Sequence, residues 1–206
     1  MDHAQSDRHT LALSCRCGTL TGRARPIDPR AGTRVVCYCK DCQAFARVLG
    51  VADRVLDRWG GTDIYQLPPA RIELLTGQDQ LRCLRLSEKG LYRWYAGCCQ
   101  TPIGNTLSAG VPVVGLIHAF FADPTTAETI LGPVRAHVHI GSATDRLPEA
   151  VWTRPGFRPY LVKIIGRMLA WKLRGLGRPT PFFTAAGAPV CTPRIATPDT
   201  PEDSHP

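Results

Sequence analysis

The sequence predicts a mainly β protein with one long α-helix near its C-terminal end. From Leu11 to about Asp145, short runs rich in β-branched and aromatic residues alternate with turn residues such as Gly77. A long helical period occurs in one segment, Arg158–Arg174. The chain has 206 residues, 44% of them hydrophobic, which is enough to bury a core without covalent cross-links.

Eight apolar segments in the first three quarters of the chain are expected to form strands. They are Leu11–Cys15, Arg34–Cys37, Thr62–Leu67, Arg71–Thr76, Leu81–Leu86, Tyr92–Ala96, Val113–Phe121 and Arg135–Ile140. A short helix is predicted from Gln43 to Val48. The chain from Thr192 onward is rich in Pro and Thr and acidic near its end, and this composition is typical of disorder.

The predicted C-terminal helix has an apolar face and a basic face. The apolar face repeats at i, i+3, i+4 and i+7 and consists of Leu161, Ile164, Ile165 and Met168. The basic face consists of Lys163, Arg167 and Arg174. Gly175 and Gly177 are expected to end the helix.

The net charge of +8 comes from the C-terminal quarter of the chain. Residues 150–198 contain eight basic and no acidic residues, whereas the rest contains 17 of each. Three interpretations of the basic helix stay open at this point. It packs its apolar face on the β domain, it lies on an anionic membrane surface with Trp171 near its end, or it contacts nucleic acid or an acidic partner.

The nine cysteines predict metal ligation more strongly than disulfides. The polar start of the chain does not resemble a secretory signal, and the longest apolar stretch, Val111–Ala122, is too short to span a membrane. We therefore expect a cytoplasmic protein, in which thiols stay reduced and short cysteine spacings mark metal sites. No phosphate-binding loop, paired catalytic carboxylates or Ser/His/Asp order stands out.

Seven of the cysteines fall into three closely spaced groups. These are Cys15 and Cys17; Cys37, Cys39 and Cys42; and the adjacent pair Cys98 and Cys99. Thiolate ligands favour zinc, and C-x-C and C-x-x-C turns can direct their sulfurs at one ion. We predict one closed site from the first and third groups and one open three-ligand site from the second. The isolated Cys83 and Cys191 are interpreted as packing residues.

Histidines within the predicted β domain offer further ligands. His137 and His139 share one face of a predicted strand, so either could supply a fourth ligand or an acid–base group. The alternative is that these two, like His118, satisfy hydrogen bonds on a half-buried surface.

The cysteine motifs and several later segments together resemble one known family. The segments are Ser14-Cys15-Arg16-Cys17-Gly18, Cys37-Tyr38-Cys39-Lys40-Asp41-Cys42, Ile72-Glu73-Leu74-Leu75-Thr76-Gly77, Tyr92-Arg93-Trp94-Tyr95, Cys99-Gln100-Thr101-Pro102 and Ala136-His137-Val138-His139-Ile140. Over roughly residues 11–145 the chain resembles the glutathione-dependent formaldehyde-activating enzymes, a family that includes centromere protein V.

The resemblance implies a β-tent fold of small coiled antiparallel sheets that binds one or two zinc ions. It also implies a structural zinc on the first C-x-C and the later cysteines, and a second zinc on Cys37, Cys39 and Cys42. There the thiol of glutathione would condense with formaldehyde, which makes the three cysteines the candidate catalytic residues of a carbon–sulfur lyase.

The chain departs from the family pattern at two places. The first ligand position of the family's later C-x-x-C is Ala96 here, and Cys98 precedes the matching Cys99, so either could be the ligand. Tyr38 stands where the family usually has His. A non-catalytic zinc module that binds a protein, nucleic acid or a membrane through the basic helix is therefore the alternative function.

The expected organisation has four parts. They are a flexible lead (residues 1–10), a zinc-binding β-tent domain (11–145), a basic helical extension packed on it (146–190) and a disordered tail (191–206).

Overall fold

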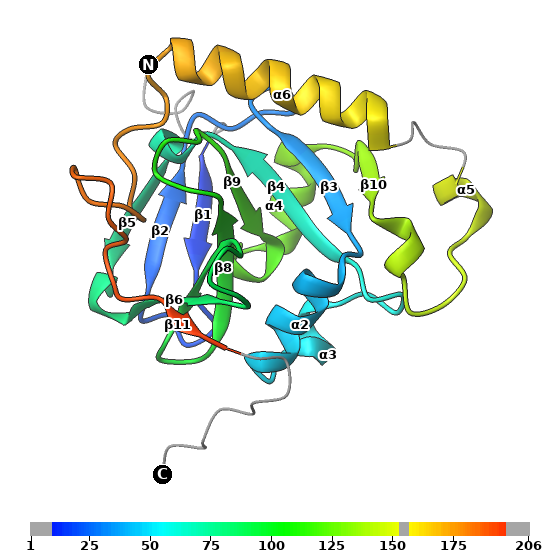
Figure 1. Ribbon diagram of the computed structural model, residues 1–206, viewed down its shortest axis with the longest axis horizontal. Helices are drawn as coiled ribbons and strands as arrows, with labels where there is room; N and C mark the ends of the chain where they lie inside the picture. The colour runs from blue at the N-terminus through cyan, green and yellow to red at the C-terminus, as the bar shows by residue number, and fades with distance from the viewer. Residues whose placement is uncertain (1–9, 153–156, 197–206) are drawn as a thin grey trace.

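The computed structural model describes residues 10–152 and 157–196 (Figure 1). Its strands form a three-stranded and an eight-stranded sheet, and α6 (Phe157–Leu173) lies across one end of the molecule. The prediction of a mainly β fold with a C-terminal helix is confirmed. The predicted lead 1–10 lies outside the described residues except for Thr10.

The large sheet has the order β10-β3-β4-β9-β8-β7-β6-β11. Its bounds are β3 Thr33–Cys37, β4 Thr62–Leu67, β6 Leu81–Arg85, β7 Tyr92–Ala96, β8 Thr101–Thr106, β9 Val114–Ile117, β10 Ala136–Val138 and β11 Arg194–Ile195. The six inner strands pair antiparallel, whereas β10 and β11 join the two edges in parallel. Long connections make these parallel edge pairings possible, because β10 and β11 join strands that are distant in sequence.

The small sheet has the order β1-β2-β5, with bounds Leu11–Ser14, Thr21–Ala24 and Ile72–Thr76. Its β1–β2 hairpin turns at the first cysteine pair, so Cys15 follows directly after β1. The hairpin fixes Cys15 against the core, where that side chain is 2% exposed.

Two large hydrophobic clusters form most of the core. The larger one lies between the two sheets and contains Trp94, Phe120 and Phe182, all fully buried. The second packs α2 (Lys40–Val48) and α3 (Ala52–Val55) on the large sheet and includes Cys37, Cys42 and Phe45. The second cysteine group is therefore built into packed structure.

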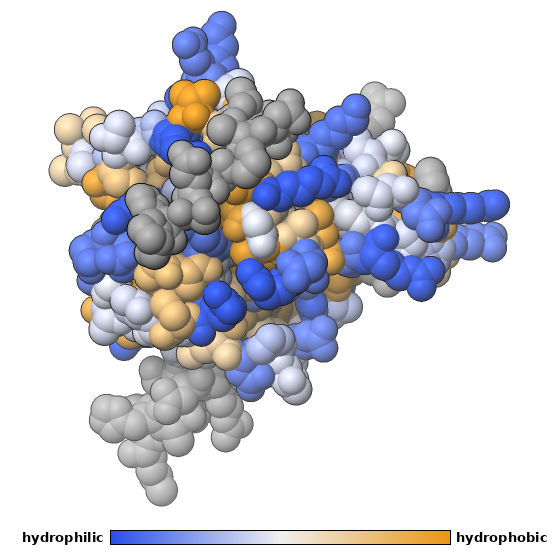
Figure 2. Space-filling view, turned by 90° about the horizontal axis from the view of Figure 1, so that it is seen from below, coloured by the Kyte–Doolittle hydropathy of each residue, from blue (hydrophilic) through white to orange (hydrophobic). Residues whose placement is uncertain are grey.

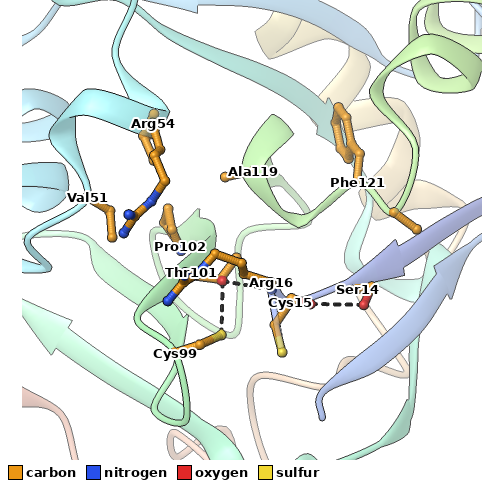
Figure 3. A pocket seen from close by; sticks show the side chains of 12 residues that line it. Ser14, Cys15, Arg16, Val51, Arg54, Cys99, Thr101, Pro102, Ala119 and Phe121 are labelled. Atoms are coloured by element: carbon orange, nitrogen blue, oxygen red, sulfur yellow. Dashed lines mark hydrogen bonds between the residues drawn. The ribbon is translucent and has the colours of Figure 1, made fainter. Parts of the chain in front are cut away.

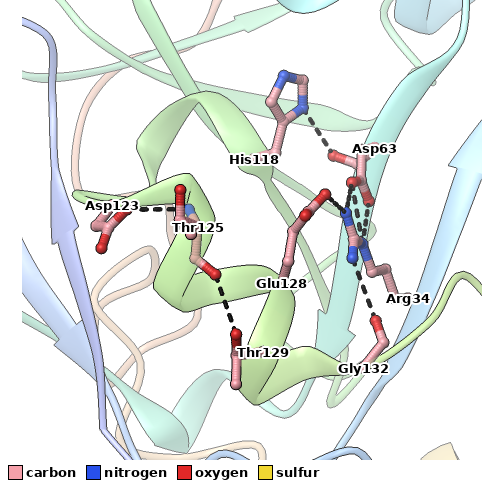
Figure 4. Close-up of polar contacts among 8 residues, drawn as sticks. All are labelled: Arg34, Asp63, His118, Asp123, Thr125, Glu128, Thr129 and Gly132. Carbon is pink, nitrogen blue, oxygen red and sulfur yellow. Dashed lines mark hydrogen bonds and ion pairs between the residues drawn. The ribbon is translucent and has the colours of Figure 1, made fainter.

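Polar contacts tie α4 (Pro124–Leu131) to the edge of the large sheet (Figure 4). Arg34 on β3 donates to Asp63 on β4 at 2.6 Å and lies 3.4 Å from Glu128 on α4. Asp123 caps α4 by accepting a hydrogen bond from the Thr125 amide at 2.9 Å. These contacts hold β3, which leads into the three-cysteine group.

The remaining helices are short. They are α5 (Glu149–Trp152) and the 3₁₀ turns η2 (Pro69–Arg71), η3 (Gln78–Gln80), η4 (His118–Phe120) and η5 (Ile140–Ser142). The strand predicted over Val113–Phe121 ends at Ile117 because the chain turns into η4, and the strand predicted over Arg135–Ile140 is shorter for the same reason at η5.

The buried face of α6 differs from the predicted one. Ile164 and Trp171 are each 5% exposed, whereas Ile165 of the predicted apolar face is 51% exposed. Arg167 donates a short hydrogen bond to the Gly32 carbonyl, which anchors one predicted basic residue to the fold. The buried face of α6 is rotated about the helix axis relative to the predicted face. The reason is that Trp171, with its large apolar area, packs with Val113.

The segment after α6 is part of the core, and its last described residues lie in the stretch that was expected to be disordered. Phe182 and Phe183 pack against Trp94 with ring centroids 5.1 and 5.6 Å away, the first ring tilted and the second edge-on. Residues 194–195 then form β11, and the Ala196 amide donates to Arg85 at 2.8 Å. Without β11, the outer edge of β6 would expose unpaired backbone groups. Pairing with these groups orders residues 194–195 despite the disorder-like composition of that segment. The tail beyond Ala196 lies outside the described residues.

Among the described residues, no helix is long and apolar enough to cross a membrane. On the face opposite α6, apolar surface lies between protruding hydrophilic side chains (Figure 2).

Candidate metal centres

The first and third cysteine groups meet in one cluster of four. Cys15 and Cys17 follow β1, and Cys98 and Cys99 occupy the turn between β7 and β8. Gly18, at φ 76°, makes a tight turn after the two cysteines, and its amide donates to the Cys15 carbonyl at 2.9 Å. Gln100 at φ 57° turns the other strand pair.

The sulfur separations in this cluster suit a tetrahedral ion. Sγ atoms are 3.5 Å apart for Cys15–Cys17, 3.3 Å for Cys17–Cys98 and 3.9 Å for Cys98–Cys99, and all four lie within 4.8 Å of one another. Four sulfurs at 2.3 Å from one zinc would stand about 3.8 Å apart. Both Cys98 and Cys99 therefore reach the cluster.

Hydroxyl and amide groups surround these sulfurs. Thr19 hydrogen bonds, together with Cys98, lower the pKa of the exposed Cys17 thiol to about 6. The Thr101 hydroxyl lies 3.1 Å from the Cys99 sulfur and accepts from the Arg16 amide at 3.0 Å. Donors around a thiolate stabilise its charge, so these groups favour the ligating form of Cys17, whereas burial raises the pKa of Cys15 and of Cys98.

A cavity of about 330 Å³ opens beside this cluster (Figure 3). Arg16 and Arg54 line it together with Cys99, Val51 and Phe121. Its two arginines give this cavity a positive lining.

Cys37, Cys39 and Cys42 form a second cluster, separate from the cluster of four. Cys37 ends β3, Cys39 caps the N-terminus of α2, and Cys42 lies in its first turn. The three sulfurs lie within 4.8 Å of one another. The Cys42 amide donates to the Cys39 sulfur at 3.3 Å, and a helix N-terminus favours negative charge on that atom.

The three thiols share their protons unevenly. Hydrogen bonds from Cys37 and Cys42 hold the pKa of Cys39 at about 2, and the same contact raises the pKa of Cys37 well above its usual range. One thiolate and two thiols therefore crowd one small volume. A divalent cation would replace the remaining protons, because thiolate ligands bind metal in their deprotonated form.

A buried arginine lies beneath the three sulfurs. The Arg93 side chain is 1% exposed, and its guanidinium approaches the Cys42 sulfur at 4.0 Å and Asp41 at 3.4 Å. Arg93 Nε is buried without a hydrogen-bond partner. Asp41 is mostly exposed, so an anionic three-thiolate centre is the better partner for this buried charge.

A cavity of about 300 Å³ lies over the three sulfurs and under α6. Tyr160 of α6 lines it, and burial raises the pKa of the Tyr160 hydroxyl. No local pattern predicts that Tyr160 lies near the cysteines, because α6 is distant from them along the chain.

The histidines are placed differently from one another. His139, at φ 56°, lines the same cavity but is outside the group of sulfurs that could share one ion. His137 Nδ1 lies 3.2 Å from the Tyr38 hydroxyl, and His118 Nδ1 lies 3.2 Å from Asp63 O. Cys83 and Cys191 belong to neither cluster and pack in the core, as expected.

Comparison of the sequence with known protein families finds a match. Residues 8–193 match the family of unknown function DUF6151. The chain belongs to this family. In this DUF6151 protein the matched region includes both cysteine clusters, α6 and the returning Phe182 segment, which agrees with their common core. A search of curated proteins finds no match to the chain.

Proposed function

We propose that this DUF6151 protein is a zinc-dependent carbon–sulfur lyase, similar to the glutathione-dependent formaldehyde-activating enzymes, that acts on a thiol–aldehyde adduct at Cys37, Cys39 and Cys42. The observation that carries the proposal is the convergence of three sulfurs at the end of a cavity. Three protein ligands with one open position are typical of catalytic zinc, whereas four sulfurs are typical of structural zinc.

The chemistry divides between the ion and the chain. Bound zinc would supply stabilisation of a substrate thiol as thiolate. In the lyase direction the carbon–sulfur bond of the adduct breaks, sulfur keeps the electron pair, and the hydroxyl loses its proton as the carbonyl forms. Arg93 offsets negative charge at the sulfurs. Tyr160 lines the cavity, and its hydroxyl accepts a hydrogen bond from Gln66 Nε2 at 2.6 Å.

The four-cysteine cluster has a structural role in this proposal. It joins the β1–β2 hairpin to the turn between β7 and β8, two segments more than eighty residues apart in sequence. Metal binding there would fix the small sheet on the large one and release protons from the cysteines.

Zinc stoichiometry and activity test the proposal together. Native mass spectrometry of the full chain, purified without chelator, is expected to find two zinc ions, and Cys39→Ser to retain one. Adduct formation from a thiol and formaldehyde should exceed the uncatalysed rate in the wild type and fall to background in Cys39→Ser. Cys83→Ser is the matched control and should keep both zinc ions and activity. A wild-type rate equal to background, with every thiol tried, would overturn the proposal.

A second candidate function is a non-catalytic module that binds an anionic membrane surface through α6. The observation that favours it is an exposed apolar stripe on α6, in which Val162 is 74% and Leu173 81% exposed, beside exposed Lys163 and Arg174. Cosedimentation with phosphatidylserine vesicles should fall at least tenfold in Leu173→Glu and stay unchanged in Val190→Glu. Equal sedimentation with neutral vesicles, or none, would refute it.

A further inference from the structure

The cavity between the three-cysteine group and α6 has apolar walls. Val35 and Ile64 of the large sheet face it from one side, and Ile164 and Met168 of α6 from the other. None of the described lining residues is Lys, Arg, Asp or Glu. The sulfurs of Cys37, Cys39 and Cys42 are therefore approached through a hydrocarbon environment.

Besides the cysteines, the polar residues that line this cavity are Gln66, Asn105, His139 and Tyr160. Gln66 lines it, and its Oε1 atom is buried without a hydrogen-bond partner, while its Nε2 atom is engaged by Tyr160. A buried amide oxygen without a donor is costly, and a ligand with one hydroxyl or amide hydrogen would satisfy it. The hydroxyl of a thiol–aldehyde adduct is such a donor.

The size of the cavity limits the ligand further. Its volume is about 300 Å³, the lower end of the range of small-molecule sites. Glutathione carries two carboxylates and an ammonium group, which would find no counter-charge in this lining.

We infer that the thiol substrate of this protein is a small, uncharged and predominantly apolar thiol, whose sulfur points to Cys37, Cys39 and Cys42 and whose hydrocarbon body lies against α6. This inference rests on the proposed function. In this inference α6 forms one wall of the substrate site, and its residues Ile164 and Met168 select the ligand.

Calorimetry on the zinc-loaded full chain tests the inference without an activity readout. The ligands are straight-chain thiols from ethanethiol to hexanethiol, the alcohols of the same lengths, and glutathione as a competitor of butanethiol. The dissociation constant of the thiols should fall about fourfold for each added methylene until the cavity is full, which is the effect of burying one CH₂ group. Glutathione should fail to displace butanethiol at tenfold excess.

A matched pair of variants locates the binding. Met168→Glu places a charge in the cavity and should weaken butanethiol binding more than tenfold, and Met168→Gln should weaken it less. Leu169→Glu is the control, because Leu169 is 59% exposed and does not line the cavity. Unchanged binding in both Met168 variants would overturn the inference.

The outcomes separate the inference from the proposed function. A series with no dependence on chain length, or displacement of butanethiol by equimolar glutathione, would overturn the inference and leave the lyase proposal in place. Alcohols that bind as tightly as thiols of equal length would overturn the proposed function and retain the apolar ligand class. Absence of binding by every chain length would overturn the inference.

Discussion

Arg93→Gln is expected to weaken metal binding at the three-cysteine site and to spare the four-cysteine site. The Arg93 guanidinium lies 4.0 Å from the Cys42 sulfur and is 1% exposed, so it acts on the site through a water-poor medium. Three thiolates and one divalent zinc carry a net charge of −1, and Arg93 neutralises it. Glutamine is shorter and keeps a polar amide group, but it removes this charge.

The magnitude follows from the distance. Two unit charges 4 Å apart interact by about 4 kcal/mol at an effective dielectric constant of 20. The negative charge is shared among three sulfurs, and the guanidinium contacts one of them, that of Cys42. We therefore expect a loss of about 2–3 kcal/mol, which is a roughly 30- to 150-fold weaker dissociation constant for the second zinc.

Competition with a chromophoric chelator measures the two zinc affinities, and protection of cysteines from alkylation assigns each ion to its site. Arg93→Lys keeps the charge and should recover most of the affinity, whereas Arg23→Gln, at an exposed ion pair with Glu73, should change neither site. A folded Arg93→Gln protein that binds both ions as tightly as the wild type would refute the reasoning. Equal loss in Arg93→Lys would assign the effect to packing instead of charge.

Three further predictions concern the four-cysteine cluster and the core. Cys98→Ser should lose one of two zinc ions by native mass spectrometry, whereas Cys83→Ser should keep both; two ions in Cys98→Ser would mean that Cys98 is no ligand. Phe182→Ala should lower the unfolding free energy by about 3–5 kcal/mol in urea titrations, and the exposed Val190→Ala by less than about 1 kcal/mol; equal losses would contradict the core position of Phe182. In metal-free protein, the rate of Cys17 alkylation by iodoacetamide should rise with pH with a midpoint near pH 6, because the pKa of the Cys17 thiol is lowered to about 6. The reactive thiolate is present above this pH and lost below it. A midpoint above pH 8 would contradict the lowered pKa.

Strands with regular apolar patterns could be predicted from the sequence, and irregular ones could not. Thr62–Leu67 and Tyr92–Ala96 are strands over the predicted bounds. β8 (Thr101–Thr106) was not predicted, since Pro102 and Gly104 are poor strand formers. Pro102 is accommodated where the register of β7 and β8 shifts, and full burial between two neighbours outweighs local preference.

The candidate metal sites followed from spacing, whereas their surroundings did not. Short spacings placed Cys37, Cys39 and Cys42 together, because residues so close in sequence share one turn. The contact with Arg93 and the cover by α6 depend on the sheet order and on chain segments far away, which no local pattern encodes. The basic residues that the sequence set on one face of the helix likewise gave no hint that Arg167 would bind Gly32.

The wide separation in sequence between the three-cysteine group and α6 has a consequence for biosynthesis. Cys42 leaves the ribosome about 115 residues before Phe157, the first residue of α6. At 5–20 residues per second, the nascent chain presents three closely spaced thiols for on the order of ten seconds before their cover exists. Early zinc capture would protect these thiols from oxidation during that interval. The four-cysteine cluster has a different schedule, because it can form only after Cys99 has been synthesised.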